Sequence, residues 1–441
     1  MLAFSLFKCV TIPHIMNIKK FRLALIILII FFLGSYIGYK IGTYKVSLDW
    51  QNFHINAINK TPPTSTSNID FSPMWDVLNK IEENYYDKSA LDPQKLVNGA
   101  ISGMVQSLGD PYTVYLPPVQ NSSFKQTLAG QFSGIGAELG MKNNDIVVIA
   151  PLDGSPAEKS GIKAGDVINK VDNQPTTGWT LDQAVNKIRG PKGTQVLIGV
   201  IHKGETKEVD LSITRDIITV KSVEGWVKKI PDITGVKING YSQDQIAYVR
   251  LSQFGDSTNQ DWLSLINKLN QQIAGNPNFK GVVLDLRNNP GGYLTDAQFV
   301  ASEFIKDGVI VREDSGNGEE QTLSVSRHGL LTDVPVVVLI NRGTASAAEI
   351  TAGALRDRRG AELIGENSFG KGIVQEADDL KELGTGAGLH ITIAKWLTPN
   401  GTWVGNGKNG VGLKPDISVA LDPKDPTHDT QLERAIEELL K

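Results

Sequence analysis

A serine and a lysine each follow an apolar stretch typical of a buried strand, and together the two side chains could carry out acyl transfer. Ser346 lies in the string NRGTASAAEI, and Lys371 lies in GENSFGKGIVQ. A serine hydroxyl becomes an effective nucleophile only when a base takes its proton. A lysine amine can act as that base if burial lowers its pKa from about 10.4, the value of a free lysine, to roughly 7–8. The apolar and glycine neighbours of Lys371, with no adjacent acid, favour such a lowered pKa.

Two other chemistries fit these strings less well. The chain has six histidines, but none lies in a catalytic-looking string and no G-x-S-x-G motif accompanies Ser346, so a Ser/His/Asp triad lacks support. The string GENSFGKG resembles a phosphate-binding loop, in which Lys371 would bind phosphate and Asp285 would bind magnesium. Gly372, however, stands where that loop needs a hydroxyl, and a β-branched stretch follows where a helix should begin. We therefore favour a Ser/Lys pair over an ATPase.

The composition is that of an ordinary globular protein with more than one domain. The chain has 441 residues, of which 40% are hydrophobic and 21% are charged, and its length exceeds what one core usually organises. Its net charge of -4 gives no electrostatic basis for binding nucleic acid. The single cysteine, Cys9, precedes the folded part, so no disulfide or cysteine-based metal site is expected there. We predict no metal and no cofactor.

The N-terminal region has the pattern of a signal anchor. Lys19, Lys20 and Arg22 precede an apolar run at 23–39, which is about 17 residues long and so at the short end of what spans a bilayer. No small-x-small cleavage site follows the run, and Met16 offers an alternative start. The positive-inside rule then puts the basic end in the cytoplasm. We predict a cytoplasmic tip and transmembrane anchor at 1–44 and a polar linker at 45–70.

In the middle of the chain, the pattern of apolar residues predicts a helical segment at 71–118 and a small β domain at 119–216. Short apolar runs separated by glycine predict strands at 145–150, 167–171, 196–201 and 208–213. An amphipathic helix is expected at 181–188, with Thr180 as its N-cap. The strings GIGAEL, SPAEKSGIKAGDVINKVD and IRGPKGT resemble PDZ domains of secreted proteases, which bind a peptide C-terminus as an added strand. The resemblance implies that the peptide carboxylate binds at the loop Ser133, Gly134, Ile135, Gly136 and Ala137.

The remaining segment, 217–441, has the pattern of an α/β domain. Continuous apolar runs at 281–286 and 334–340 predict strands buried on both faces, and helices are expected at 261–273 and 295–305. Active sites gather in the loops that follow such parallel strands, which is where LRNNPGGYL and the Ser346 string lie. The stretch 224–245 looks like an insertion, and its pattern suggests no function.

Several strings in order resemble the carboxyl-terminal processing proteases, also called tail-specific proteases. Beyond the Ser346 and Lys371 strings, they are ENYYD, LGDPYTVYLPP, LTPNGTW and GVGLKPDI. The resemblance implies a multidomain α+β protein whose protease core is of the ClpP/crotonase type. It also implies the following roles: Ser346 as nucleophile, Lys371 as general base, Gln375 orienting the lysine, backbone N–H groups of Gly292 and Ala347 as the oxyanion hole, and Arg189 coupling peptide binding to catalysis.

The expected function is that of a serine endopeptidase that cleaves proteins near their C-terminus. The PDZ domain would select substrates with an apolar, uncharged C-terminal tail, and the anchor would hold the protease on the outer side of the cell membrane. A peptide-tail-binding scaffold without catalysis is the main alternative, and hydrolysis of a non-peptide ester is a third. A homodimer is left open.

Overall fold

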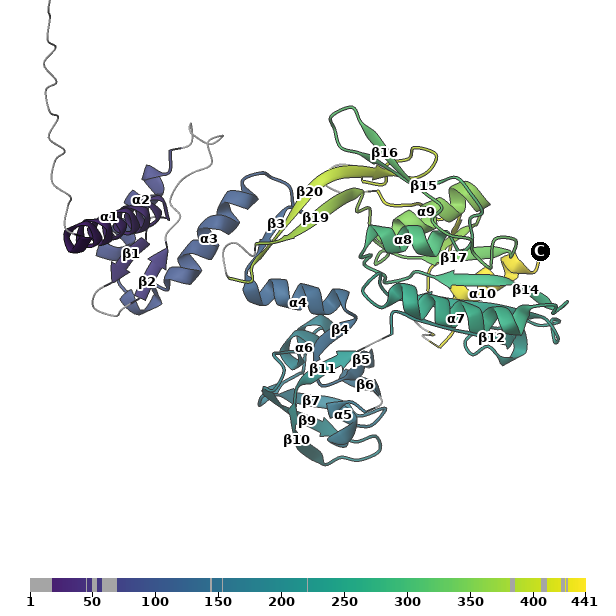
Figure 1. Cartoon of the computed structure of the whole chain (residues 1–441). Helices are drawn as coiled ribbons and strands as arrows, with labels where there is room; N and C mark the ends of the chain where they lie inside the picture. The colour runs from purple at the N-terminus through teal and green to yellow at the C-terminus, as the bar shows by residue number, and fades with distance from the viewer. Residues whose placement is uncertain are drawn as a thin grey trace, which may run out of the picture. The chain divides into compact units, whose positions relative to one another are not determined.

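The computed structural model describes residues 18–44, 46–49, 54–57, 70–142, 145–152, 154–219, 221–380, 385–405, 411–421, 425 and 427–441. The chain divides into two compact units, Met1–Asp92 and Pro93–Lys441 (Figure 1).

In the first unit, the described residues form two α-helices, one short 3-10 helix and a pair of strands. Its elements are α1 (Ile18–Tyr44), β1 (Val46–Asp49), β2 (His54–Ala57), α2 (Ser72–Asn84) and the short 3-10 helix η2 (Lys88–Ala90), with β1 antiparallel to β2. The apolar run at 23–39 lies in α1, but the described residues contain no helix both long and apolar enough to cross a membrane. The structure therefore does not support the predicted anchor. The strands β1 and β2 lie in the segment expected to be a linker; its residues 58–69 and the leader 1–17 lie outside the described residues.

A small antiparallel sheet forms the part of the second unit between residues 131 and 219. In sheet order its strands are β10 (Glu208–Thr214), β9 (Gln195–Ile201), β7 (Val167–Val171), β6 (Asp145–Pro151) and β5 (Ala137–Lys142), with β8 (Gln174–Pro175) paired to β7, while β4 (Gln131–Gly134) pairs with β11 (Asp216–Thr219). Two helices, α5 (Pro156–Lys159) and α6 (Leu181–Ile188), pack with it. Thr180 and Gln183 form a reciprocal capping box at the start of α6, which confirms the predicted N-cap. Among the described strands, β5 is at the edge of the sheet.

A mostly parallel sheet forms the centre of the larger domain. In sheet order its strands are β12 (Val223–Lys229), β13 (Gln245–Leu251), β14 (Phe279–Asp285), β17 (Val336–Ile340), β18 (Leu363–Gly365) and β21 (Ile417–Ser418); only β12 runs antiparallel to its neighbour. Because β14 and β17 are parallel neighbours, the loops that follow them lie at the same edge of the sheet. That edge holds the glycine-rich string after β14 and Ser346 after β17.

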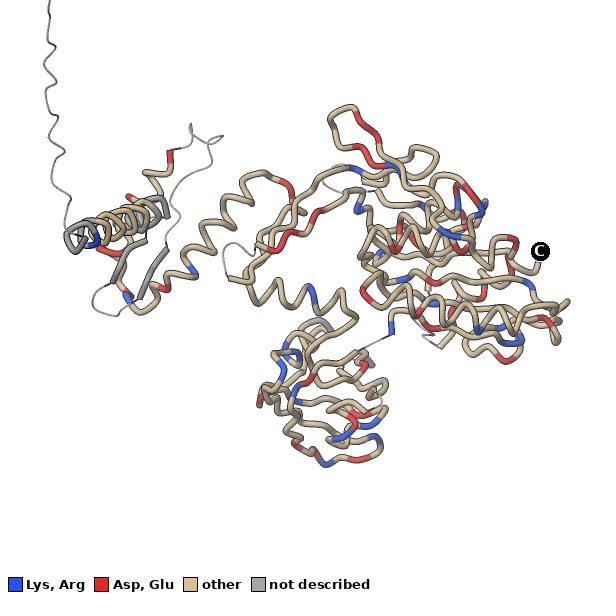
Figure 2. The backbone as a smooth tube through the Cα atoms, viewed as in Figure 1, with Lys and Arg blue, Asp and Glu red and all other residues tan. Residues whose placement is uncertain are grey.

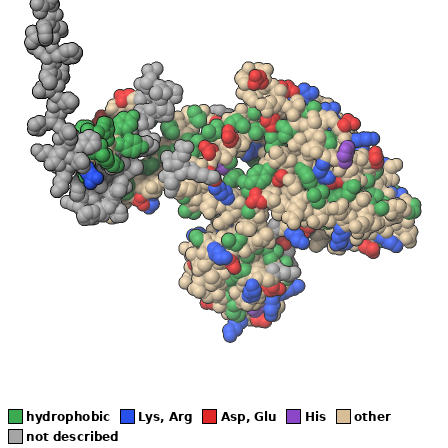
Figure 3. Space-filling model, viewed as in Figure 1, with side chains coloured by type: hydrophobic (Ala, Val, Ile, Leu, Met, Phe, Trp, Pro, Cys, Tyr) green, Lys and Arg blue, Asp and Glu red, His purple; other side chains and the backbone are tan. Residues whose placement is uncertain are grey.

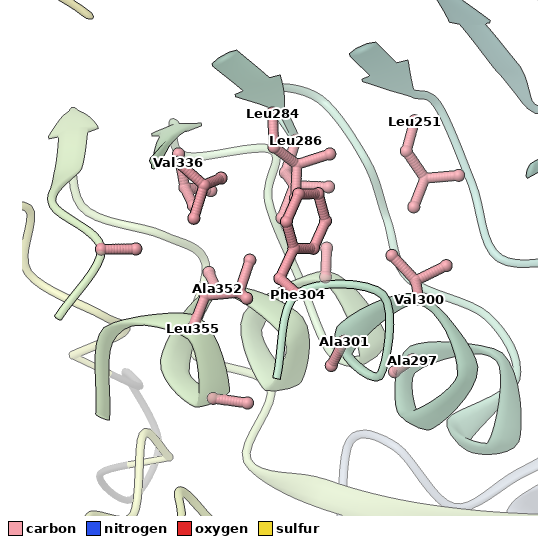
Figure 4. Packing of buried hydrophobic residues seen from close by; sticks show 14 of the residues in the cluster. Leu251, Leu284, Leu286, Ala297, Val300, Ala301, Phe304, Val336, Ala352 and Leu355 are labelled. Carbon is pink, nitrogen blue, oxygen red and sulfur yellow. The ribbon is translucent and has the colours of Figure 1, made fainter. Parts of the chain in front are cut away.

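Both faces of this sheet are covered by helices. On one face α7 (Thr258–Ile273), α8 (Leu294–Ala301) and α9 (Ala347–Arg359) bury a cluster in which Leu284 and Leu286 face Phe304 and Leu355 (Figure 4). On the other face α10 (Thr430–Leu439) packs against a second cluster that includes Val283. Successive residues of β14 thus point to opposite, equally apolar faces, which explains the continuous apolar runs in the sequence.

A second sheet connects the N-terminal part of this unit to the core. Its strands are β16 (Glu320–Ser324), β15 (Val309–Asp314), β20 (Gly388–Leu397) and β19 (Ile373–Asp379), with β3 (Val114–Leu116) added on β20. The helices α3 (Pro93–Gln106) and α4 (Pro118–Leu128) flank β3 in the chain (Figure 1). The end of α4 is bonded to the core, because Asp256 N–H donates to the Leu128 carbonyl at 2.9 Å. A Cβ at Gly255 would lie 1.9 Å from the same oxygen, so only glycine fits there.

The stretch at 224–245, which the sequence left unexplained, completes the parallel sheet. It supplies the edge strand β12 and the 3-10 helix η3 (Ile230–Asp232). Ile230 and Ile233 are buried in the cluster under α10. This part of the chain is therefore structural, since its apolar side chains cover one face of the sheet.

One buried carboxylate in the core predicts a measurable dependence of stability on pH. Asp296, in the first turn of α8, accepts a hydrogen bond from Asn259 Nδ2 at 2.9 Å, and burial raises its pKa to about 6. Because the pKa is higher in the folded than in the unfolded state, stability falls as the pH rises from about 4 through about 6, where the folded carboxyl ionises. We expect Asp296→Asn to raise the free energy of unfolding by about 1 to 2 kcal/mol at pH 8 and little at pH 4. Denaturant unfolding at both pH values measures this, with exposed Asp333→Asn as the control; equal effects at both pH values would contradict it.

Candidate active site

Charge alone does not mark a functional face on this protein. Lys and Arg are interspersed with Asp and Glu throughout the second unit (Figure 2). A cavity of about 470 Å³ at the loop edge of the parallel sheet locates the site instead. Its walls are mostly apolar and come from α4, β3, β19, β20 and the loops after β14 and β17. The polar side chains that line it include Ser346, Lys371, Gln375 and His390.

Ser346 lies at a sharp turn between β17 and α9. Its backbone has φ 54° and ψ −119°, a conformation that costs a non-glycine residue on the order of 1–3 kcal/mol. Two hydrogen bonds hold this turn: Ser346 N–H donates to Glu349 Oε2 at 2.8 Å, and the Ser346 carbonyl accepts from Ile350 N–H at 2.9 Å. The surrounding structure therefore fixes a strained backbone at the residue whose hydroxyl is the candidate nucleophile.

Lys371 lies in the loop between β18 and β19. Its Nζ donates a 2.5 Å hydrogen bond to Gln375 Oε1, and Gln375 Nε2 in turn donates to the Tyr112 carbonyl at 2.6 Å. The Nζ atom also lies 5.6 Å from the centre of the Tyr112 ring. The Lys371 carbonyl accepts a hydrogen bond from Trp396 Nε1 at 2.8 Å, which fixes the backbone beneath the amine. The structure thus brings Gln375 directly onto Lys371.

The surroundings of Lys371 favour the neutral amine. Burial lowers its pKa, and the charge of Glu349 opposes that shift only in part. Ser346 and Lys371 line the same cavity, but no hydrogen bond joins Ser346 Oγ to Lys371 Nζ in the described chain. Catalytic hydrogen bonds are often long without substrate and shorten when it binds. The two residues are therefore a hydroxyl and a partly buried amine that line the same cavity, as general-base activation of a serine requires.

The glycine-rich loop after β14 brings free backbone donors next to Ser346. Phe254 bonds to both neighbours of Gly292, since its N–H donates to the Gly291 carbonyl and its carbonyl accepts from Tyr293 N–H. Because of this pairing, the N–H of Gly292 points away from Phe254. In the described structure neither this N–H nor that of Ala347 has an acceptor. A Cβ at Gly291 would lie 2.8 Å from Ser346 Cβ, so the two loops are in close contact. Two such donors are what an oxyanion hole needs.

Glu349 joins the serine loop to the lysine loop, a role that was not predicted from the sequence. The carboxylate is fully buried and accepts from the N–H groups of Ser346 at 2.8 Å, Gly370 at 2.7 Å and Lys371 at 2.9 Å, and from Ser368 Oγ. Burial raises its pKa, while these hydrogen bonds favour the charged form. Its position three residues after Ser346 fits a Ser-x-x-Glu capping box, which was the available signal.

The structure also brings one histidine to the cavity. His390 lines it from β20, and burial together with the charge of Lys371 lowers its pKa. None of the described carboxylates is hydrogen-bonded to its ring, as a Ser/His/Asp triad would require. The ATPase interpretation is wrong for two reasons. Lys371 leads into a strand instead of a helix, and Asp285 is hydrogen-bonded to Arg287 and to Tyr248 Oη instead of lying free for magnesium.

The residues predicted to bind a peptide tail lie together beside β5. Ser133 and Gly134 end β4, Gly136 has φ 76°, and Ala137 begins the edge strand. A Cβ at Gly136 would lie 2.5 Å from Ser155 Cβ, so the tight loop requires glycine. The buried Ile135 carbonyl accepts from Ala157 N–H at 2.7 Å. Arg189 lies at the end of α6 over the Phe132 ring, 5.1 Å from its centre. Its described contacts are within this domain, and none joins it to Ser346 or Lys371.

Three protein-family models match the chain in succession. Residues 28–118 match the activating protease CtpB N-terminal domain, residues 124–201 match the PDZ domain, and residues 245–419 match peptidase family S41. The last match contains the Ser346, Lys371 and glycine-rich loops described above.

Known proteins are similar over most of the chain. Carboxy-terminal processing protease CtpA of Bacillus subtilis is 38% identical over 81% of this chain and 70% of its own length. A carboxy-terminal-processing protease of Bartonella bacilliformis is 39% identical over 78% of this chain and 74% of its own. Among solved structures, a putative S41 protease from Bacteroides fragilis has a TM-score of 0.53 at 18% identity, covering 81% of this chain and 91% of that one, which shows a shared fold.

Proposed function

This chain belongs to the carboxy-terminal processing proteases of peptidase family S41, and from that premise we propose that it is a Ser346/Lys371 endopeptidase that cleaves proteins near apolar C-terminal tails. The observation that carries the proposal is that Ser346 and a partly buried Lys371 line one cavity. Family membership establishes a serine-type peptidase with a PDZ domain. The roles of individual residues and the choice of substrate are our own inference.

The proposed reaction proceeds through an acyl-enzyme. Neutral Lys371 takes the proton from Ser346 Oγ as that oxygen attacks the scissile carbonyl carbon. The carbonyl oxygen becomes an oxyanion, which accepts hydrogen bonds from the N–H groups of Gly292 and Ala347. The peptide C–N bond then breaks, and the Lys371 ammonium gives its proton to the leaving amine. Water, deprotonated by the same amine, hydrolyses the ester and restores Ser346. Gln375 keeps the lysine Nζ in place throughout.

The PDZ domain would select the substrate through its edge strand. A peptide C-terminus added beside β5 would find unpaired backbone groups there, and its carboxylate would reach the loop Ser133–Ala137. Arg189 lies next to Gly134 of that loop, which fits our proposal that it senses the bound tail. Coupling from Arg189 to the catalytic pair remains part of the proposal.

A reactive-serine probe distinguishes this enzyme from a peptide-binding scaffold on the same fold. We expect a fluorophosphonate to label the wild-type protein at a single serine, because Ser346 is activated and lies in an open cavity. Ser346→Ala should lose the label, whereas Ser324→Ala, which changes an exposed serine of β16, should keep it. Mass spectrometry of the labelled peptide identifies the site. A wild-type protein that stays unlabelled would favour the scaffold.

We also propose that segment 1–44 tethers the protease to the cell membrane with its catalytic part outside the cytoplasm. This rests on the sequence pattern of Lys19, Lys20 and Arg22 before the apolar run at 23–39. Release of the full-length chain without detergent would contradict it.

Exposed apolar side chains suggest how two copies of the chain would associate. Exposed apolar side chains occur on α3, α4 and β20, among them Met104, Val119 and Ile393, and Figure 3 shows hydrophobic groups on the surface. We propose a second copy of the chain as the partner of this surface, and a monomeric mass in solution would exclude it.

A further inference from the structure

One polar side chain of the active-site cavity has no role in the proposed reaction. His390 lies on β20 between Val114 of β3 and Ala377 of β19, and only 7% of its surface is exposed. It lines the same cavity as Ser346 and Lys371. The surrounding wall is apolar, with Val114, Phe124 and Ala377 as its immediate partners. An imidazole in such a wall needs an explanation.

The His390 ring is packed but not hydrogen-bonded. Phe124 contacts it edge to face, with ring centres 4.4 Å apart and planes at 66°, so the ring orientation is restricted. In the described part of the chain, neither ring nitrogen has a hydrogen-bond partner. The ring nitrogens are not among the described side-chain atoms that are both fully enclosed and unpaired, so they are open to the cavity and can bond a partner that enters it. A bound substrate is such a partner.

The sheet register places His390 two residues along β20 from Thr392, the residue that pairs with Gln375. On β20 the inward-facing positions alternate, and Thr392 pairs with Gln375 while His390 pairs with Ala377. Two residues along a strand span roughly 7 Å, about the spacing of alternate side chains in an extended peptide. Gln375 holds Lys371, so a group bonded to His390 would lie about one or two residues from the scissile bond.

The charge state of His390 suits recognition of a neutral polar group. Burial lowers its pKa below that of a free histidine, and any charge on Lys371 would lower it further, which favours the neutral ring. A neutral imidazole offers one donor and one acceptor. A side-chain hydroxyl offers the same pair, whereas a methyl group of the same size offers neither.

We propose that His390 is a specificity-determining residue, whose imidazole hydrogen-bonds the side-chain hydroxyl of a substrate residue flanking the scissile bond. The substrate class is therefore proteins with threonine or serine at that position, with apolar residues around it. This inference rests on the proposed function, because it requires the cavity to hold a peptide. It assigns His390 no part in proton transfer.

The test uses pairs of substrates that differ only by threonine or valine, two residues of nearly the same shape. The exchange is made in turn at the two residues before the cleaved bond and at the two residues after it. We expect wild-type kcat/KM to favour threonine about fivefold at one position, as one net hydrogen bond allows. His390→Leu should lose this preference, so that its kcat/KM values for the threonine and valine substrates become similar. His390→Gln, which keeps a hydrogen-bonding group, should retain it. Ile391→Leu changes the neighbouring outward-facing side chain and should behave as wild type.

The outcomes separate this inference from the proposed function. If wild type and His390→Leu cleave with the same threonine-to-valine ratio at every position, the inference is wrong and the protease assignment stands. If both His390→Leu and His390→Gln lose all cleavage, His390 serves the chemistry or the fold, and a role in specificity is excluded. If wild type shows no cleavage that Ser346→Ala abolishes, the proposed function fails and the inference fails with it.

Discussion

Lys371→Met is expected to lower kcat/KM for a protein with an apolar C-terminal tail by about 10⁴-fold. Methionine keeps the length and apolar contacts of the side chain but removes the amine that takes the proton from Ser346. Lys371→Arg should be equally inactive, because a guanidinium stays protonated. Ser346→Ala should reach the same residual rate, and the double variant should be no slower, because the two residues act as a unit. Cleavage followed by mass spectrometry measures each rate.

The control for these variants is Lys395→Met, which makes the same change at an exposed lysine on β20. It should cleave at the wild-type rate. Circular dichroism and thermal unfolding should show all variants folded, since none removes a core residue. A Lys371→Met protein with more than about a tenth of wild-type activity would mean that another group, with His390 the nearest candidate, takes the serine proton.

The pH profile gives the same hypothesis a second measurement. The base must be uncharged, so below the pKa of Lys371 the rate should fall tenfold for each pH unit. Burial lowers this pKa from that of a free lysine, which shifts the rising limb of the profile toward neutral pH. The residual activity of Lys371→Met should not show this rise of rate with pH. If the rate of this variant still rises with pH in the same range, a titratable group other than Lys371 causes the rise.

The sequence predicted those elements whose patterns are local. Strands β6, β7, β9 and β10 begin and end within one residue of the expected limits, because polar or glycine-containing turns interrupt the apolar runs. Strands β14 and β17 lie where continuous apolar runs indicated them, since helices cover both faces of their sheet. Ser346 and Lys371 share a cavity, as expected from loops that follow parallel strands, since Ser346 follows β17 and Lys371 follows β18.

Elements and contacts that depend on distant residues were not predictable. Strands β19 and β20 form an arch whose pairing with β3 joins residues far apart in the chain, and their half-exposed pattern is weak in the sequence. His390 reaches the cavity only through that register. Glu349 reads in the sequence as one more acidic residue near a helix start, and its importance appears only when the lysine loop folds onto it.

Glu349→Gln is expected to lower kcat by about 10²-fold, because it disturbs the serine and lysine loops together. Four donors converge on the two carboxylate oxygens: the N–H groups of Ser346, Gly370 and Lys371, and the hydroxyl of Ser368. An amide of the same shape has a single oxygen, and its NH₂ group would face donors that it cannot accept from. The strained turn at Ser346 then loses one of its two hydrogen bonds.

The readout that identifies this role is the pH profile. The Glu349 charge raises the pKa of Lys371 against the effect of burial, so removing the charge should move the rising limb to lower pH even as kcat falls. A purely structural residue would lower the amount of active protein without moving the limb. Glu376→Gln, the same change at an exposed position on β19, should alter neither quantity. If Glu349→Gln has the same kcat as the wild type, backbone hydrogen bonds alone are enough to hold the turn at Ser346. A reduced kcat with an unmoved limb would leave Glu349 as support for Ser346 only, since its charge would then not act on the lysine.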